Sequence, residues 1–230
     1  MALEDFTTYS ETDPTSKITV TSTKVDVAAI PEEDDAFVVD DKGVGHFDGD
    51  FEHLTEFYLN SSTTNGISAL MWQLANSATM VSTGGGPHQF VRAYDDSTPQ
   101  ACAGDATAQD CVNWNTDTLY YCIVERDESI GTYGTLYCYF YTDSGRTTLA
   151  FTSTQTLAVA KYDWRYIYAF SNYGNSVGSY VWTGYSQNFD LQEGGTGPAK
   201  LKTLNTVAKA NVKTINGVAI ASVKTIDTVV

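Results

Sequence analysis

Short runs of β-branched and aromatic residues alternate with clusters of Gly, Asn, Asp and Ser through residues 1–192. No window of a dozen residues carries a strong helical period, so the pattern predicts strands throughout this part of the chain. The expected strands are residues 17–22, 36–40, 51–59, 68–75, 89–94, 119–126, 135–141, 164–171 and 178–191. Strands at this spacing predict an all-β fold, in which two antiparallel sheets pack as a sandwich.

The best-defined pairing lies in residues 119–141, whose sequence is LYYCIVERDESIGTYGTLYCYFY. A hairpin symmetric about residue 130 places Cys122 opposite Cys138 and turns one side of both strands toward the core. This arrangement is compatible with a cross-strand disulfide and equally with two buried thiols. The sequence leaves that choice open.

Cys102 and Cys111 bracket a short segment of Ala, Gly and Asp that we interpret as a loop. A disulfide between them would stiffen the loop, and reduced thiols are the alternative. A zinc site is disfavoured, because neither a CxxC spacing nor clustered histidines accompany the cysteines.

Acidic side chains outnumber basic ones by 28 to 13, which gives a formal net charge of -15. This charge disfavours binding to nucleic-acid phosphates and to anionic lipids, so neither is expected as a partner. No apolar stretch approaches the roughly 20 residues of a spanning helix, and no membrane insertion is expected. The opening sequence MALEDFTTYSE lacks the basic flank and apolar core of a signal peptide, which predicts a soluble, intracellularly made chain.

The end of the chain differs from the rest in charge and composition. Residues 193–198, EGGTGP, have the composition of a short flexible linker, so we divide the chain into residues 1–192, a linker, and a tail of residues 199–230. The tail is mildly basic, whereas the body before it carries the acidic excess. Two regions with different roles are therefore predicted.

The tail repeats itself as LKTLNTVAKAN, VKTINGVAIAS and the truncated VKTIDTVV, beginning at residues 201, 212 and 223. Its β-branched residues and the turn signal Asn216-Gly217 favour short strands over a helical coil. Such a segment is too short to bury its own apolar side, so it needs cover from its body, sister chains or a larger particle. The expected assembly residues are Leu201, Leu204, Val207, Val212, Ile215, Val218, Ile220, Val223 and Ile226.

Three strings carry a family resemblance: AFVVDDKGVGHFDGDFEHLTEFYL (36–59), LYYCIVERDESIGTYGTLYCYFYTDSGRTTL (119–149) and WRYIYAFSNYG (164–174). They resemble concanavalin A-like, laminin-G-like lectin and glucanase domains of tailed-phage and environmental viral structural proteins. The resemblance covers most of residues 5–191 and implies a jelly-roll sandwich that holds carbohydrate or binds another protein. It marks the fold more firmly than an activity.

Related glucanases carry the pattern E-x-D-x-E on one strand, where alternate carboxylates straddle a glycosidic bond. This chain has Asp48, Asp50 and Glu52 at that spacing, with Glu56 following, but its first residue differs. A solvated acidic sheet face is the favoured interpretation. His53 is expected to be half-buried and hydrogen-bonded, and other catalytic motifs are absent, so we expect the chain not to be an enzyme.

The resemblance also implies a structural calcium, with Asp35 and Asp190 as candidate ligands and a solvated acidic edge as the alternative. No other cofactor is expected. Carbohydrate recognition needs aromatic faces together with a few orienting polar groups. The candidate carbohydrate-binding residues are Trp72, Arg92, Tyr94, Tyr168 and Tyr173, with burial of the aromatics in the core as the alternative.

These features together predict a virion structural protein, a fibre, tail or decoration component located at the virion surface. In this hypothesis the jelly roll is displayed, with a surface glycan as a candidate ligand. The tail then mediates homo-oligomerisation or docking to other virion proteins. A carbohydrate-binding module or inactive glucanase-like lectin is the alternative, and the subunit of a self-assembling extracellular filament is the third hypothesis.

Overall fold

The computed structural model of the chain describes residues 3–31, 35–60, 67–79, 88–95, 98–158, 160–172 and 181–192, together with four two-residue strands further along. Within these residues the fold is all-β, apart from the short 3-10 helix η1 (Phe6–Thr8). No helix among them has the length and hydropathy needed to cross a membrane.

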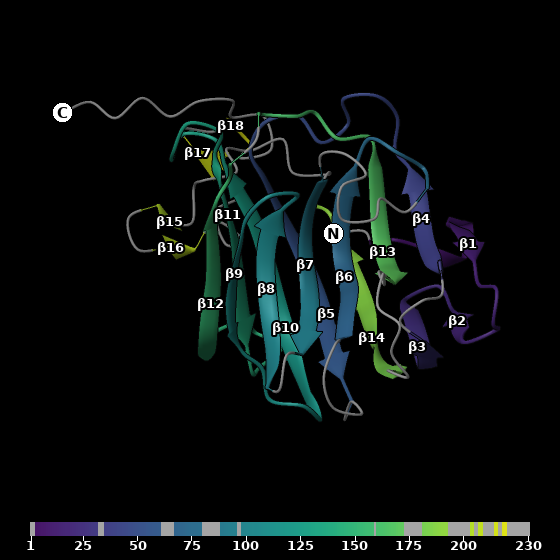
Figure 1. Cartoon of the computed structure of the whole chain (residues 1–230). Helices are drawn as coiled ribbons and strands as arrows, with labels where there is room; N and C mark the ends of the chain where they lie inside the picture. Colours follow the sequence, from purple (N-terminus) through teal and green to yellow (C-terminus); the bar gives the residue numbers. More distant parts are fainter. Residues whose placement is uncertain are drawn as a thin grey trace.

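Sheet A contains seven antiparallel strands in the order β1-β4-β13-β6-β7-β8-β9 and forms the front layer in Figure 1. Their bounds are β1 (Ser10–Thr12), β4 (Phe37–Asp41), β13 (Tyr166–Asn172), β6 (Ile67–Ala75), β7 (His88–Asp95), β8 (Pro99–Asp105) and β9 (Gln109–Asn113).

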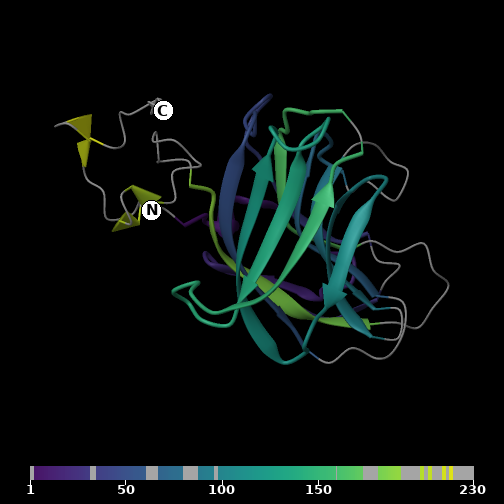
Figure 2. The ribbon, with the colours of Figure 1, turned by 90° about the vertical axis from the view of Figure 1, so that its left-hand side faces the viewer.

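Sheet B also contains seven antiparallel strands, in the order β12-β11-β10-β5-β14-β3-β2. Their bounds are β12 (Leu149–Thr156), β11 (Thr135–Tyr141), β10 (Thr118–Asp127), β5 (Phe51–Leu59), β14 (Val181–Asp190), β3 (Lys24–Pro31) and β2 (Ile18–Val20). The two sheets form the two layers of Figures 1 and 2. The predicted two-sheet antiparallel sandwich is therefore confirmed, and each predicted strand of the body is present.

The alternation along β5 shows how the sequence produces a two-layer fold. Phe51, His53, Thr55, Phe57 and Leu59 are buried, whereas the residues between them are half-buried. Because successive side chains of a strand point to opposite faces, one face of the strand enters the core and the other turns outward. The strands β10 and β11 alternate in the same way, so sheet B has one face in the core.

The hairpin of β10 and β11 forms as predicted, but its register is shifted. Cys122 lies opposite Phe140, and Cys138 lies opposite Val124. The turn occupies residues 128–134, because Asp127 pairs with Thr135. A shift of two residues leaves every side chain on its predicted face. Both cysteines are therefore buried in the core, and both are reduced thiols.

The segment between Cys102 and Cys111 is a hairpin of β8 and β9, not the predicted loop. The two cysteines lie directly opposite one another and form a disulfide with a sulfur-to-sulfur distance of 2.06 Å. β8 is rich in alanine and glycine, residues that strands usually lack. Its small residues Ala101 and Ala103 are fully buried, which indicates close packing against sheet B.

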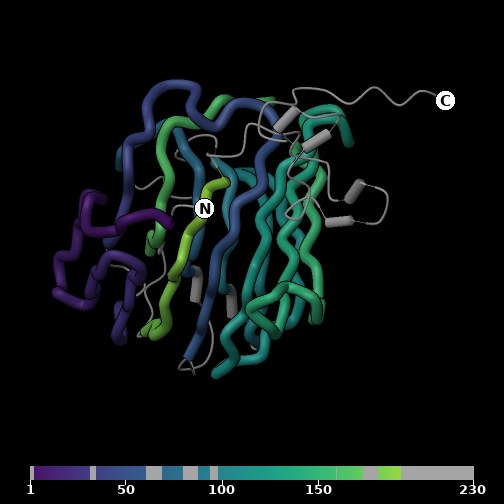
Figure 3. Tube along the Cα trace, turned by 180° about the vertical axis from the view of Figure 1, so that it is seen from behind, coloured from purple at the N-terminus to yellow at the C-terminus, as the bar shows by residue number. Residues whose placement is uncertain are grey.

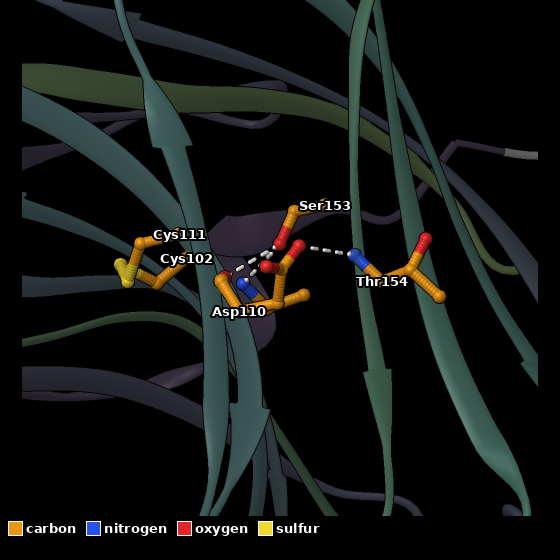
Figure 4. Close-up of a disulfide and its surroundings, with 6 residues drawn as sticks. Cys102, Asp110, Cys111, Ser153 and Thr154 are labelled. Atoms are coloured by element: carbon orange, nitrogen blue, oxygen red, sulfur yellow. Dashed lines mark hydrogen bonds between the residues drawn. A yellow bond between two sulfur atoms is a disulfide. The ribbon is translucent and has the colours of Figure 1, made fainter.

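The edge strands of the two sheets, β9 and β12, are joined by polar contacts beside the disulfide (Figure 4). The Oγ of Ser153 accepts a hydrogen bond from the amide of Ala103 at 2.9 Å and donates one to the carbonyl of Asp110 at 2.7 Å. The amide of Thr154 donates to the Asp110 carboxylate at 2.8 Å. These bonds close one side of the sandwich.

The tail contains two antiparallel strand pairs, β15 (Thr203–Leu204) with β16 (Val207–Ala208) and β17 (Thr214–Ile215) with β18 (Val218–Ala219). Each pair occupies the same position in its sequence repeat, so the repeat corresponds to a short hairpin. This agrees with the prediction of short strands and turns. The other predicted assembly residues, Leu201, Val212, Ile220, Val223 and Ile226, lie outside the described residues.

Candidate functional site

Trp72, the first predicted carbohydrate-binding residue, lies in the core and not on a surface. It is fully buried, and its indole Nε1 donates a hydrogen bond to Nδ1 of His53 at 3.2 Å. The pairing of β6 with β7 shifts between Leu70 and Trp72, which marks a β-bulge. A bulge adds one residue to a strand and changes which side chains face inward. The prediction of Trp72 as a sugar platform is therefore wrong.

Two of the other predicted residues, Arg92 and Tyr168, lie on the side of sheet A that faces away from the core. Arg92 is half-buried on β7, and Tyr168 is buried on β13, two strands away. Tyr94 belongs to β7, where its backbone pairs with Gln100. Tyr173 lies outside the described residues. The structure thus places two of the predicted side chains, Arg92 and Tyr168, on one face, which we call the outer face of sheet A.

Two rows of paired residues cross this outer face. In one row Tyr168 lies opposite Gln73, which lies opposite Phe90. In the other, Ser171 lies opposite Leu70, Leu70 opposite Arg92, and Arg92 opposite Cys102 of the disulfide. Residues in register on neighbouring antiparallel strands have Cβ atoms about 4.5–5.5 Å apart. The outer face therefore gathers a phenol, an amide and a guanidinium over three adjacent strands, β13, β6 and β7.

Gln73 is the residue on this face whose bonding is incomplete. Its Oε1 accepts a hydrogen bond from Ser171 Oγ at 2.8 Å. Its Nε2 is buried and has no hydrogen-bond partner among the described residues. A buried donor left unpaired costs about 1–3 kcal/mol relative to a satisfied one. The free energy lost here is available to a ligand that presents an oxygen to Nε2.

His88 and Arg92 flank Phe90 on the same face. The His88 ring lies 5.4 Å from the Phe90 ring, and the guanidinium carbon of Arg92 lies 5.4 Å from the same ring. A cation over an aromatic face is held by the ring quadrupole. The sequence analysis missed His88, Gln73 and Ser171. These residues could have been noticed in the sequence, because each is a polar residue within a strand whose other residues are mostly apolar.

Tyr168 is anchored at the edge of this group. Its hydroxyl donates to the carbonyl of Ser77 at 2.6 Å, and its ring packs edge-on against Phe37 at 6.0 Å. Burial raises the pKa of Tyr168, and the neighbouring Tyr166 adds to the effect. The phenol therefore keeps its proton at neutral pH and is a hydrogen-bond donor.

The predicted calcium ligands Asp35 and Asp190 are not brought together. The segment that follows Asp35 is bonded to Asn172, which lies at the Val181 end of β14. Asp190 closes the opposite end of that strand, where its Oδ1 accepts from the amide of Gln192 at 3.0 Å. No group of three or more His, Cys, Asp or Glu side chains within the described ranges is arranged to hold a metal ion.

The glucanase-like carboxylates do not share one strand face either. Asp48 and Asp50 precede β5, and Asp50 accepts a hydrogen bond from the amide of Glu128 at 2.6 Å. Glu52 and Glu56 lie on the half-buried side of β5, away from the core. His53 is buried and accepts the bond from Trp72, so it is a hydrogen-bonded core imidazole.

No protein-family model matches the chain, and no curated protein matches it in sequence. The fold is similar to that of a mutant of the alginate lyase Aly36B in complex with alginate trisaccharide, at 10% identity and a TM-score of 0.52, over 80% of this chain and 87% of that one. The marine PL-14 alginate lyase of Aplysia kurodai gives 12% identity and a TM-score of 0.49, over 79% and 85% of the two chains. The exoplasmic/lumenal domain of VIP36, bound to Ca²⁺ and Man3GlcNAc, gives 11% and 0.47, over 80% and 82%.

At such identities the likeness shows a shared fold and nothing finer. It nevertheless overturns the expectation that the chain is not an enzyme. That expectation rested on the absence of known catalytic motifs and on an acidic sheet face interpreted as solvated, whereas an alginate lyase, the Aly36B mutant, is similar in fold over 80% of this chain. The viral context of the sequence resemblance finds no support in these comparisons. The chain is thus a two-sheet jelly-roll sandwich, a fold that it shares with the alginate lyase Aly36B.

Proposed function

We propose that this chain binds a polysaccharide that carries carboxylate groups, on the outer face of sheet A. The observation that supports the proposal is the buried Nε2 of Gln73, a hydrogen-bond donor without a partner among the described residues. It lies one strand from Arg92, on the same face. An acceptor oxygen at Nε2 would recover the free energy that the unpaired donor costs.

Arg92 supplies the charge that such a ligand needs. A guanidinium presents two parallel N–H groups that match a carboxylate, and such charge-assisted bonds are about twice as strong as neutral ones. The net charge of -15 opposes long-range attraction of a polyanion, so recognition depends on short-range contacts at this face. The Aly36B mutant is in complex with alginate trisaccharide, which makes alginate the first ligand to test.

A second candidate function is β-elimination on the bound uronate. It is favoured by the presence of His88 and Tyr168 on the same face as Arg92. In this reaction Arg92 neutralises the carboxylate, and the imidazole of His88 takes the proton from the carbon beside it. A carbon–carbon double bond forms as the glycosidic carbon–oxygen bond breaks, and the phenol of Tyr168 donates a proton to the leaving oxygen.

The test compares alginate with a neutral β-glucan by calorimetric titration of the whole chain. Binding of alginate is expected, together with at least a tenfold loss of affinity in Arg92→Gln, since tenfold corresponds to about 1.4 kcal/mol. Arg165→Gln is the matched control, because Arg165 lies directly before β13 and forms a solvent-exposed ion pair with Asp41. Equal affinities for the two polymers, or equal losses in the two variants, would contradict the proposal. Ultraviolet absorption by an unsaturated product would identify elimination.

Display of this site on a virion stays a prediction from the sequence resemblance. The same holds for its location at a virion surface and for tail-mediated docking to virion proteins. Binding of a polysaccharide does not depend on any of them, because the residues that support it belong to the sandwich alone.

A further inference from the structure

The side of sheet B that faces away from the core forms a second surface, which Figure 3 views from behind the molecule of Figure 1. Its outward positions alternate with the buried ones along β5, β10, β11 and β14. Apolar and aromatic side chains occupy most of them. We call this surface the tyrosine face, and its half-buried residues are Leu54, Tyr58, Leu119, Tyr121, Ile123, Tyr137, Tyr139, Tyr141 and Tyr185.

Neighbouring tyrosines on this face pack against each other. The rings of Tyr58 and Tyr185 are stacked at 4.8 Å, and those of Tyr137 and Tyr139 at 5.9 Å. Stacked rings present their edges and hydroxyls to solvent, an arrangement typical of protein interfaces. Within the described residues the elements are the two large sheets, the two tail hairpins and η1, whose Phe6 is buried in the core. No described element forms a third layer over the tyrosine face.

Acidic side chains interrupt the tyrosine face. Glu52 lies directly opposite Glu125 on the adjacent strand, and Glu56 follows on the same side of β5. Like charges directly opposite one another are unfavourable in a sheet. The Glu125 carboxylate also interacts with Tyr139 on this face. The face therefore combines aromatic surface with negative charge.

The tail has the complementary composition. From residue 199 onward it carries one acidic side chain, Asp227, and five lysines, Lys200, Lys202, Lys209, Lys213 and Lys224. In each repeat a lysine precedes an apolar residue by two positions, as Lys213 precedes Ile215. Residues two apart in an extended segment share a face. Such a segment presents lysine and an aliphatic side chain together, which fits a surface of carboxylates and tyrosines.

We propose that residues 199–230 of one copy dock on the tyrosine face of a second copy, with their lysines beside Glu52 and Glu125. Isolated two-stranded hairpins are marginally stable in water, so β15–β16 and β17–β18 gain stability from a surface that covers them. The two hairpins form sheets of their own and do not extend sheet B of their own chain. A contact between two different surfaces is head-to-tail, and it builds a ring or a filament.

Full-length variants test this contact. The face variant carries Glu52→Lys with Glu125→Lys, and the tail variant carries Lys202→Glu, Lys213→Glu and Lys224→Glu. Wild type is expected to sediment at a multiple of 25.1 kDa, and each variant alone at the monomer mass. The control variant, Glu11→Lys with Asp35→Lys, makes the same charge change as the face variant at two exposed positions outside sheet B and keeps the wild-type mass.

Mixing the face variant with the tail variant gives the decisive result. The face variant retains an intact tail and the tail variant an intact face, so the mixture is expected to form dimers through one native contact. A monomeric wild type overturns the proposal, as does a mixture that stays monomeric. Loss of thermal stability in both variants with no change of mass would place the tail on its own chain, and would also overturn docking to a second copy.

Discussion

The indole Nε1 of Trp72 in sheet A donates a hydrogen bond to Nδ1 of His53 in sheet B, at 3.2 Å. The His53 ring is also stacked on Phe51, with the ring centroids 4.5 Å apart. The bond fixes the tautomer, because an acceptor Nδ1 leaves the proton of a neutral imidazole on Nε2. It joins the two sheets through a histidine that must stay neutral.

Stability is therefore expected to fall at acidic pH through His53. Burial, followed by the charge of Arg126, lowers the pKa of His53 to about 3, from an ordinary value of 6.5. Between these values the unfolded chain binds the extra proton, so the free energy of unfolding decreases as pH falls, by up to about 1.4 kcal/mol per pH unit. Urea titrations across this range measure the slope. His53→Gln should flatten it, and an unchanged slope would refute the role of this residue.

Replacement of Arg126 is expected to lower the free energy of unfolding more than replacement of a solvent-exposed arginine. The guanidinium of Arg126 donates to the carbonyls of Gly49, Tyr162 and Phe47, and its side chain is 1% exposed. Arg126→Ala leaves three carbonyls without this donor and should destabilise the chain by about 3–5 kcal/mol. Arg165→Ala, which removes an exposed ion pair, should cost less than about 1 kcal/mol. Denaturant unfolding of both variants measures the difference, and similar midpoints would contradict it.

Gln73→Leu separates binding from stability at the outer face of sheet A. The substitution removes the unpaired Nε2 together with Oε1, the acceptor of the Ser171 bond, and replaces the amide with an apolar group of similar size. The free energy of unfolding should change by no more than about 1 kcal/mol, whereas alginate affinity should fall at least about tenfold. Thermal unfolding and titration of the same sample give both values. Ser171→Ala breaks the same hydrogen bond to Oε1 but keeps Nε2, so it is the control and should weaken stability more than binding.

Reduction of the disulfide between Cys102 and Cys111 should destabilise the sandwich. Its loop has a sequence separation of 9, for which chain entropy predicts about 2–3 kcal/mol. The unfolding midpoint with and without reductant measures this loss. A double Cys102→Ala, Cys111→Ala variant should match the reduced protein and be insensitive to reductant. If reductant still shifted the unfolding midpoint of that variant, the loss of stability would not come from this disulfide.

The sandwich could be predicted because the alternation of apolar and polar residues in strands such as β5 and β10 identifies a strand and its buried face. This alternation does not depend on which residues pair across neighbouring strands. The same reasoning explains why the cysteine pairing in β10 and β11 was misplaced while both thiols were correctly placed on the core side. A bulge cannot be inferred from periodicity, so Trp72 was assigned to the wrong face. β8 was overlooked because a segment rich in alanine and glycine has the composition of a loop. Small residues are needed in this strand because the two sheets pack closely together there.

Gln73 could not be recognised as part of a candidate site from its own strand. A glutamine between apolar residues is equally compatible with a satisfied core amide. Only the strand order, which places β6 between β13 and β7, shows that Gln73 lies next to Tyr168 and Phe90. Non-local pairing of this kind is not encoded in the pattern of any single segment.

The polar contacts between Asp110 and β12 have a further effect on solubility. Thr154 belongs to the outermost strand of sheet B, and its amide is occupied by the Asp110 carboxylate. An edge strand with unpaired backbone amides can form hydrogen bonds with a strand of another chain, which leads to aggregation. The carboxylate blocks that position, so uncontrolled stacking of sandwiches through this side is suppressed.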